Sequence, residues 1–304
     1  MTVKQIHVEA STYCNARCPL CPRNHYGYNV TGVYPELNLS VEKFKHCLSD
    51  FPNRELVLFN GNLGDPMMNP DILRLAQLVG CETQVTTNGS IGNSMTWKGL
   101  ARLGVEVIFS VDGLEDTNHL YRQDVLWTKV IERMNWFIQA GGNAIWKFVV
   151  FKHNSHQKEK AKELSRDLGF QNFWLVDHGR NYGPVLDKKA RVTHWILPED
   201  GSKVPESCYD VKAGIERYKK THNNFKPEQK KYDISCEHLE KASVFIDARG
   251  RVSPCCYQGF DLPDRPFREL QEFNNLRKTW ETTECDRVCA ESCGSKKMFR
   301  TFSH

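Results

Sequence analysis

The chain has 304 residues, enough for one large domain or for a large and a small one. Its composition, 40% hydrophobic and 26% charged, is ordinary for a globular protein. A net charge of +4, from 41 basic and 37 acidic residues, gives no argument for nucleic-acid binding. No stretch approaches the roughly 18 apolar residues of a membrane span, and the N-terminus lacks the apolar run of a signal peptide. We therefore expect a cytoplasmic protein with no membrane partner.

Short apolar runs alternate with amphipathic stretches over the first 180 residues. The predicted strands are residues 6–10, 55–60, 82–87, 105–111, 144–151 and 173–177. The predicted helices are residues 39–48, with Ser40 as N-cap, 70–79, 95–103, 127–139 and 156–168. Such βα repeats predict an α/β fold with a parallel sheet and helices outside it, either an open doubly wound sheet or a partial barrel.

The alternation of predicted strands and helices ends near residue 180. Residues 181–234 are polar, weakly periodic and rich in Lys, Asn, Pro and Gly, so we interpret them as a linker or insertion. Residues 235–304 form a separate cysteine-rich region. The expected organisation is therefore a core domain at 1–180, the linker or insertion at 181–234 and a small C-terminal domain at 235–304.

The chain contains twelve cysteines, and nine of them fall into two groups. Three lie between residues 14 and 21, and six lie between residues 236 and 293. Disulfides are unusual in a reducing cytoplasm, so metal binding is the leading explanation for the two groups. We expect the isolated Cys47, Cys81 and Cys208 to serve ordinary packing.

The first group has the spacing C-x3-C-x2-C, at Cys14, Cys18 and Cys21, directly after the first predicted strand. Three thiolates on one loop can hold three corners of a [4Fe–4S] cluster, which leaves the fourth iron for a small molecule. In parallel βα folds this edge of the sheet carries the active site. The alternative is a structural zinc, for which His25 is the best fourth ligand.

The segment CNARCPLCPR, residues 14–23, resembles the cluster motif of the radical S-adenosylmethionine superfamily. The resemblance implies a partial (β/α)6 TIM-like barrel over residues 1–180, with a [4Fe–4S] cluster and S-adenosylmethionine as cofactors. In that superfamily the open iron binds the methionine moiety, and the reduced cluster cleaves the sulfonium to a 5′-deoxyadenosyl radical. The radical takes hydrogen from a substrate. The implied partners are a small-molecule or peptide substrate and an electron donor such as flavodoxin or ferredoxin.

Further stretches resemble parts of the cofactor site in this superfamily. The segment Gly61-Asn62-Leu63-Gly64-Asp65-Pro66 resembles the glycine-rich loop that meets the methionine amino group, and it assigns Gly61, Gly64 and Asp65 to cofactor binding. Asp65 replaces the usual Glu. The alternative is a simple turn between strand and helix.

The other implied cofactor contacts are Asn88, Ser110, Lys147 and Leu20. Asn88 follows the third predicted strand, Ser110 ends the fourth, and Lys147 lies on the fifth. Leu20 stands where the superfamily usually has an aromatic residue beside the adenine.

The second cysteine group resembles the auxiliary-cluster extensions called SPASM and twitch domains. Cys236 is followed by a predicted hairpin with Gly250 at its turn, and Cys255 comes next. The resemblance implies a second [4Fe–4S] cluster held by Cys236, Cys255 and two of Cys285, Cys289 and Cys293, with Cys256 directed elsewhere. The alternative is an all-thiolate zinc site of the C-x3-C-x3-C kind.

These patterns favour a radical S-adenosylmethionine enzyme with one auxiliary cluster. Two other classes stay open, namely an iron–sulfur electron carrier and a zinc-binding interaction protein. The sequence assigns no catalytic acid or base and does not choose the substrate.

Overall fold

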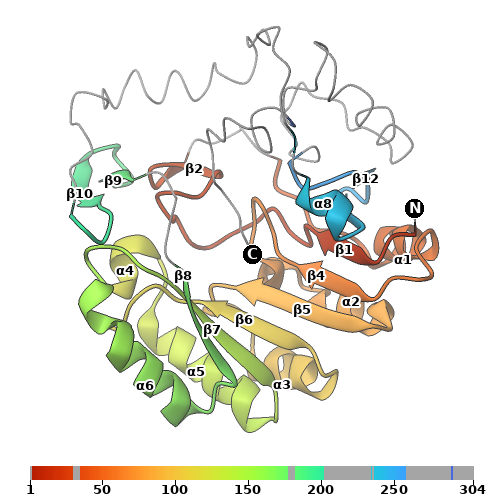
Figure 1. Ribbon diagram of the computed structural model, residues 1–304, viewed down its shortest axis with the longest axis horizontal. Coiled ribbons are helices and arrows are strands. Elements are labelled where there is room, and N and C mark those ends of the chain that lie inside the picture. The colour runs from red at the N-terminus through yellow and green to blue at the C-terminus, as the bar shows by residue number, and fades with distance from the viewer. Residues whose placement is uncertain are drawn as a thin grey trace, which may run out of the picture.

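The computed structural model describes residues 2–29, 35–176, 182–201, 234, 236–257 and 289. These residues form one eight-stranded sheet with helices along one face, and two small two-stranded sheets (Figure 1). The small sheets are hairpins of β2 (Asn24–His25) with β3 (Tyr28–Asn29) and of β9 (Gly183–Leu186) with β10 (Val192–Ile196).

The large sheet is almost entirely parallel. Its strands, in order across the sheet, are β12 (Val252–Ser253), β11 (Ser243–Ile246), β1 (Gln5–Val8), β4 (Leu56–Phe59), β5 (Glu82–Thr87), β6 (Glu106–Ser110), β7 (Asn143–Val149) and β8 (Asn172–Val176). Neighbours from β11 to β8 run parallel, and β12 is antiparallel to β11. The order ends at β12 and β8 without pairing between them, so the sheet is an incomplete barrel and the predicted α/β fold is confirmed.

Five helices line the outer face of this sheet, and consecutive ones pack against each other. They are α1 (Val41–Ser49), α2 (Ile72–Val79), α3 (Ser94–Arg102), α5 (Trp127–Gln139) and α6 (Lys158–Leu168). Short helical turns occur at η1 (Pro66–Met68), α4 (Asn118–Tyr121), η2 (Ser155–Gln157) and α8 (Glu237–Glu240). The predicted cap of α1 is confirmed, since the Ser40 hydroxyl accepts a hydrogen bond from the Lys43 backbone N–H at 3.3 Å.

The predicted core elements all form, and no described end differs from its prediction by more than two residues. The predicted C-terminal hairpin also forms, as β11 and β12. It does not stand apart from the barrel, because β11 pairs with β1 in parallel from Gln5↔Ser243 to Val8↔Ile246. The sheet thus crosses from the predicted core domain into the predicted C-terminal domain, and the domain division itself stays a prediction.

The two faces of the sheet differ in chemistry. Alternate residues point to opposite faces of a strand. Phe109 points to the helices, where its ring stacks on Trp97 of α3 at 5.3 Å, and Val107 shares that side. The neighbouring Ser110 and its register partner Lys147 therefore point to the opposite, inner face. On this inner face Ser110 and Lys147 lie beyond the buried Ile108 and Ile145, so polar groups reach the interior of the barrel near the carboxyl ends of β6 and β7.

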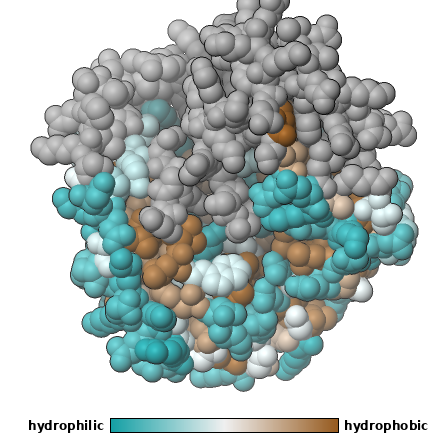
Figure 2. Space-filling view, viewed as in Figure 1, coloured by the Kyte–Doolittle hydropathy of each residue, from teal (hydrophilic) through white to brown (hydrophobic). Residues whose placement is uncertain are grey.

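In the part of the chain that the structure describes, no helix combines the length and apolar character needed to cross a membrane. Figure 2 shows mainly polar residues over the helix-covered part of the visible face and apolar residues gathered over the β7–β8 region. Trp174 and Leu175 of β8 are 40% and 46% exposed, so this edge strand presents large apolar side chains to solvent.

Candidate functional site

The three cysteines of the first group lie on the loop that follows β1, at the carboxyl edge of the sheet. Cys18 is buried, whereas Cys14 and Cys21 are half-buried. The Cys21 N–H donates to the Cys18 carbonyl at 3.1 Å, which turns the loop back on itself. Burial raises the pKa of the Cys14 thiol, and Asp65, Cys18 and Cys21 raise it further by charge repulsion.

That electrostatic environment fits a bound cation. Several thiolates repel each other when they share a small buried volume, and a coordinated metal ion removes the repulsion. Thiolates are also the ligands that iron–sulfur clusters take. Among the residues that the structure describes, no three His, Cys, Asp or Glu side chains lie close enough together to hold a single metal ion, whereas in a [4Fe–4S] cluster each thiolate binds a different iron. The ligand roles of Cys14, Cys18 and Cys21 therefore stay predictions, and no closed zinc set with His25 is present among these residues.

The glycine-rich loop after β4 packs directly onto the cysteine loop. The Asp65 N–H donates to the Tyr13 carbonyl at 2.8 Å. A Cβ on Gly64 would lie 1.9 Å from the Ser11 carbonyl oxygen, so no other residue fits there without moving the backbone. A Cβ on Gly61 would lie 2.5 Å from the carboxylate of Glu9. Glycine is thus required at both positions because the glycine-rich loop packs closely against the segment from Glu9 to Ser11. A simple turn between a strand and a helix does not need such close packing.

Glu9 holds this glycine-rich loop in place from the end of β1. Its carboxylate accepts hydrogen bonds from three consecutive backbone N–H groups, those of Asn62 at 2.6 Å and of Leu63 and Gly64 at 3.1 Å each. Burial raises the Glu9 pKa to about 7, although the three hydrogen bonds oppose the shift. Glu9 was not among the residues predicted for the site, and the available signal was a charged residue within the otherwise apolar first predicted strand, residues 6–10.

Asp65 bridges the glycine-rich loop to the end of β5. Its carboxylate accepts hydrogen bonds from the Met67 N–H at 3.0 Å, the Thr87 hydroxyl at 2.8 Å and the Asn88 N–H at 2.8 Å. The side chain is 5% exposed. Through these contacts Asp65 joins the glycine-rich loop to the loop after β5. Its role in cofactor binding stays a prediction.

Asn88 reaches the cysteine loop from β5. Its side-chain amide donates to the side-chain oxygen of Asn15, Oδ1, at 3.0 Å and lies 4.0 Å from the Cys14 sulfur. The Asn15 side-chain amide in turn donates to the Ser90 hydroxyl at 2.8 Å. The structure therefore places Asn88 beside the cysteine loop, and its role toward the cofactor stays a prediction.

The remaining predicted contacts surround this edge of the sheet. Ser110 and Lys147 are side by side on the inner face, and Ser110 is 9% exposed. Leu20 is half-buried and packs against the apolar core. Their roles toward a cofactor stay predictions.

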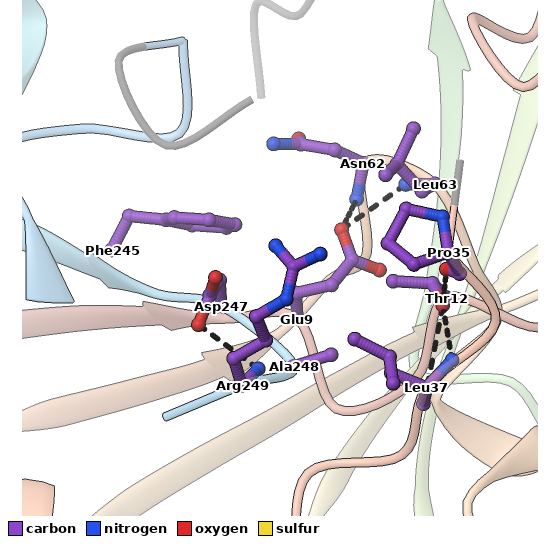
Figure 3. A pocket seen from close by; sticks show the side chains of 10 residues that line it. All are labelled: Glu9, Thr12, Pro35, Leu37, Asn62, Leu63, Phe245, Asp247, Ala248 and Arg249. Atoms are coloured by element: carbon purple, nitrogen blue, oxygen red, sulfur yellow. Dashed lines mark hydrogen bonds between the residues drawn. The ribbon is translucent and has the colours of Figure 1, made fainter. Parts of the chain in front are cut away.

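A pocket lies beside the glycine-rich loop (Figure 3). The pocket is an open hollow of about 330 Å³, a volume that includes space continuous with solvent. Glu9, Asn62 and Leu63 form one side, and Phe245, Asp247 and Arg249 of the β11–β12 hairpin form another, with the Arg249 guanidinium directed toward Glu9. The hairpin thus borders the glycine-rich loop. The Asn62 side chain reinforces this contact by donating to the Cys256 carbonyl at 3.2 Å.

The second cysteine group is described in part. Cys236 precedes α8, Cys255 and Cys256 follow β12, and Cys289 is half-buried. Cys285 and Cys293 lie outside the described residues. The Cys256 sulfur is 3.8 Å from Nε2 of His238, whose Nδ1 contacts the Ser243 hydroxyl at 2.7 Å. Cys256 therefore has a partner of its own within the described chain, and the second ligand set stays a prediction.

Comparisons with known proteins support the fold. No family model matches the sequence. The tungsten-containing aldehyde ferredoxin oxidoreductase cofactor-modifying protein of Pyrococcus furiosus is 23% identical over 270 residues, which cover 83% of this chain and 71% of the relative. The crystal structure of Streptococcus suis SuiB bound to S-adenosylmethionine matches with a TM-score of 0.58 and 16% identity, over 95% of this chain and 67% of SuiB.

A second solved structure is native anSMEcpe with bound AdoMet and the Kp18Cys peptide. It matches with a TM-score of 0.53 and 15% identity, over 83% of this chain and 74% of anSMEcpe. The chain has the fold of SuiB and anSMEcpe, two proteins solved with bound S-adenosylmethionine. The fold that the resemblance of the cysteine motif implies is confirmed, and the identities are too low to transfer an activity or a substrate.

Replacing Gly64 with Ala tests the close packing of the two loops. The added Cβ would meet a backbone oxygen that cannot rotate away, so we expect the glycine-rich loop to shift and the free energy of unfolding to fall by about 1–3 kcal/mol. Urea unfolding measures the change. Gly99→Ala is the control, because there the Cβ meets only the flexible end of Leu73, and an unchanged unfolding free energy in Gly64→Ala would contradict the expectation.

Replacing Glu9 with Gln tests the buried carboxylate. Between its ordinary pKa of 4.5 and its folded value of about 7, the native state binds more protons at Glu9 than the unfolded state does. The wild type should therefore lose unfolding free energy, on the order of 3 kcal/mol, as the pH rises through this range. Glu9→Gln should lack that loss. Urea unfolding at pH 4 and pH 8, on either side of this range, measures it.

The control for this experiment is Glu55→Gln, since Glu55 is an exposed carboxylate paired with Lys4. Its pH dependence should follow that of the wild type. Parallel pH profiles for wild type and Glu9→Gln would show that Glu9 does not titrate in this range.

Proposed function

We propose that this chain is a radical S-adenosylmethionine enzyme that holds a [4Fe–4S] cluster through Cys14, Cys18 and Cys21. The observation that carries the proposal is the junction of the cysteine loop with the glycine-rich loop at the carboxyl edge of the sheet. The Asp65–Tyr13 hydrogen bond and the close approach of Gly64 to Ser11 fix the two loops together. When bound, the cluster and S-adenosylmethionine supply one-electron cleavage of the sulfonium.

The chain's own groups would bind and orient the cofactor. Asn88 lies beside Cys14, and Ser110 and Lys147 extend the same inner face. The Lys147 ammonium suits a carboxylate, and the Ser110 hydroxyl can donate or accept.

The proposed substrate is a peptide or a small molecule such as an alcohol or a cofactor precursor. The anSMEcpe match contains a bound peptide, which favours the first class, and the Pyrococcus relative is described as cofactor-modifying, which favours the second. An electron donor such as flavodoxin or ferredoxin and a reducing cytoplasmic location complete the proposal.

Two other functions fit the cysteines less well. In an electron carrier, protein ligands bind every iron of the cluster. Such a protein does not need a glycine-rich loop packed against the cysteine loop, and it does not need polar groups on the inner face of the sheet. A zinc-binding interaction protein normally needs four protein ligands, and the first group offers three cysteines at close spacing. Iron and sulfide in the anaerobically purified protein, as opposed to zinc in a colourless one, separate the enzyme from the zinc protein.

Replacing Cys18 with Ala tests the first cluster. Loss of one of three thiolates should leave no stable cluster, so the dithionite-reduced variant should release no 5′-deoxyadenosine above background. Chromatography of 5′-deoxyadenosine and methionine measures the cleavage. Cys81→Ala is the control, because Cys81 lies between α2 and β5, away from the loop. Wild-type turnover in Cys18→Ala would refute the assignment.

Replacing Cys236 with Ala tests the proposed second cluster. The variant should lose about four irons per chain and keep the first cluster, since Cys236 lies on a different segment from the β1 loop. Iron and sulfide analysis beside the Cys81→Ala control measures the loss. An unchanged iron count would show that Cys236 is not a ligand.

A further inference from the structure

Arg122 connects the cysteine loop to the end of β6. The residue follows α4, and its side chain is only 15% exposed. Its Nε donates to Oδ2 of Asp112 at 2.7 Å, and its Nη1 donates to the Cys18 sulfur at 3.5 Å. A single guanidinium therefore joins a buried carboxylate to the middle cysteine of the motif.

Asp112 is itself rigidly held. Its side chain has no exposed surface, and Oδ1 accepts a hydrogen bond from the Val149 N–H at 2.7 Å. Its backbone is fixed as well, because the Asn154 amide donates to the Asp112 carbonyl at 2.9 Å and the Asp112 N–H donates to the Asn118 side chain at 3.1 Å. The carboxylate is thus fully oriented by strands and turns of the barrel.

The guanidinium is a permanent cation at this position. An arginine guanidinium keeps its proton throughout the pH range in which proteins are folded, and this one lies against the Asp112 carboxylate. The Tyr121 ring, 5.3 Å from the guanidinium carbon, contributes a further attraction. A positive charge and an N–H group are therefore held at the Cys18 sulfur at every pH at which the protein is folded.

The two arginines of the cysteine loop itself make different contacts. Arg17 donates to Asp124 at 2.7 Å and to the Gly27 carbonyl at 2.7 Å. Arg23 donates to the Thr12 carbonyl and, at 2.8 Å, to Glu36. Both use oxygen acceptors. Arg122 differs from them because it donates to a sulfur as well as to a carboxylate.

We propose that Arg122, positioned by Asp112, raises the reduction potential of the cluster that Cys18 would hold. This inference rests on the proposed function, since it needs a cluster at Cys18. The reduced cluster carries one more negative charge than the oxidised one, and its electron comes from a one-electron reductant such as reduced flavodoxin, ferredoxin or dithionite. A cation and an N–H···S hydrogen bond stabilise the more negative state, so they favour reduction. Arg122 acts through the Cys18 sulfur and is therefore a positioning residue, with no contact to the substrate in this proposal.

The test is a redox titration of the anaerobically reconstituted protein, followed by electron paramagnetic resonance of the first cluster in a Cys236→Ala background. Arg122→Gln removes the cation and leaves the Asp112 charge in place, so its midpoint should lie clearly below that of the parent. Arg122→Lys keeps a charge with poorer geometry, and its midpoint should fall between the two. Arg54→Gln is the control, because Arg54 donates to the carbonyls of Leu48, Phe51 and Val79, and its loss affects stability alone.

The outcomes separate the two claims. A cluster present in Arg122→Gln with a midpoint equal to or above that of the parent would overturn the role of Arg122 and leave the proposed function intact. If the glutamine variant does not fold, Arg122→Lys decides, and a midpoint at or above that of the parent overturns the inference. Absence of any cluster from the parent protein would overturn both claims.

Discussion

Parallel pairing is the constraint on which the site depends. Because β1, β4, β5, β6 and β7 run in the same direction, their carboxyl ends meet at one edge of the sheet. Segments far apart in the chain therefore become neighbours there: the Arg122 guanidinium reaches the sulfur of Cys18, 104 residues away, and Asn88 reaches Cys14, 74 residues away.

Three buried carboxylates hold that edge rigid. Glu9 accepts hydrogen bonds from the glycine-rich loop, Asp65 from the ends of that loop and of β5, and Asp112 from β7 and Arg122. Each uses backbone N–H groups that would otherwise be buried without a partner, which is costly inside a protein. Loops fixed in this way can position a cofactor without first having to be ordered by it.

The fold could be predicted from the sequence because its signal is local. Apolar runs, the Ser40 cap and the hairpin turn at Gly250 each depend on neighbouring residues. The pairing of β11 with β1 was not predictable in this way, since it joins segments more than 200 residues apart. Within the site, cysteine spacing identified the loop, but the partners of its side chains did not follow from spacing. Arg122 lies ten residues beyond Asp112 and gives no sequence signal of its contact with Cys18.

The most direct measurement of the central claim is pulsed electron paramagnetic resonance of the reduced protein with S-adenosylmethionine labelled with ¹⁵N in its amino group. A cluster held by three thiolates has an iron available to the cofactor, so the account predicts hyperfine coupling to the labelled nitrogen. A spectrum that the cofactor leaves unchanged, with all four irons bound by protein donors, would contradict it.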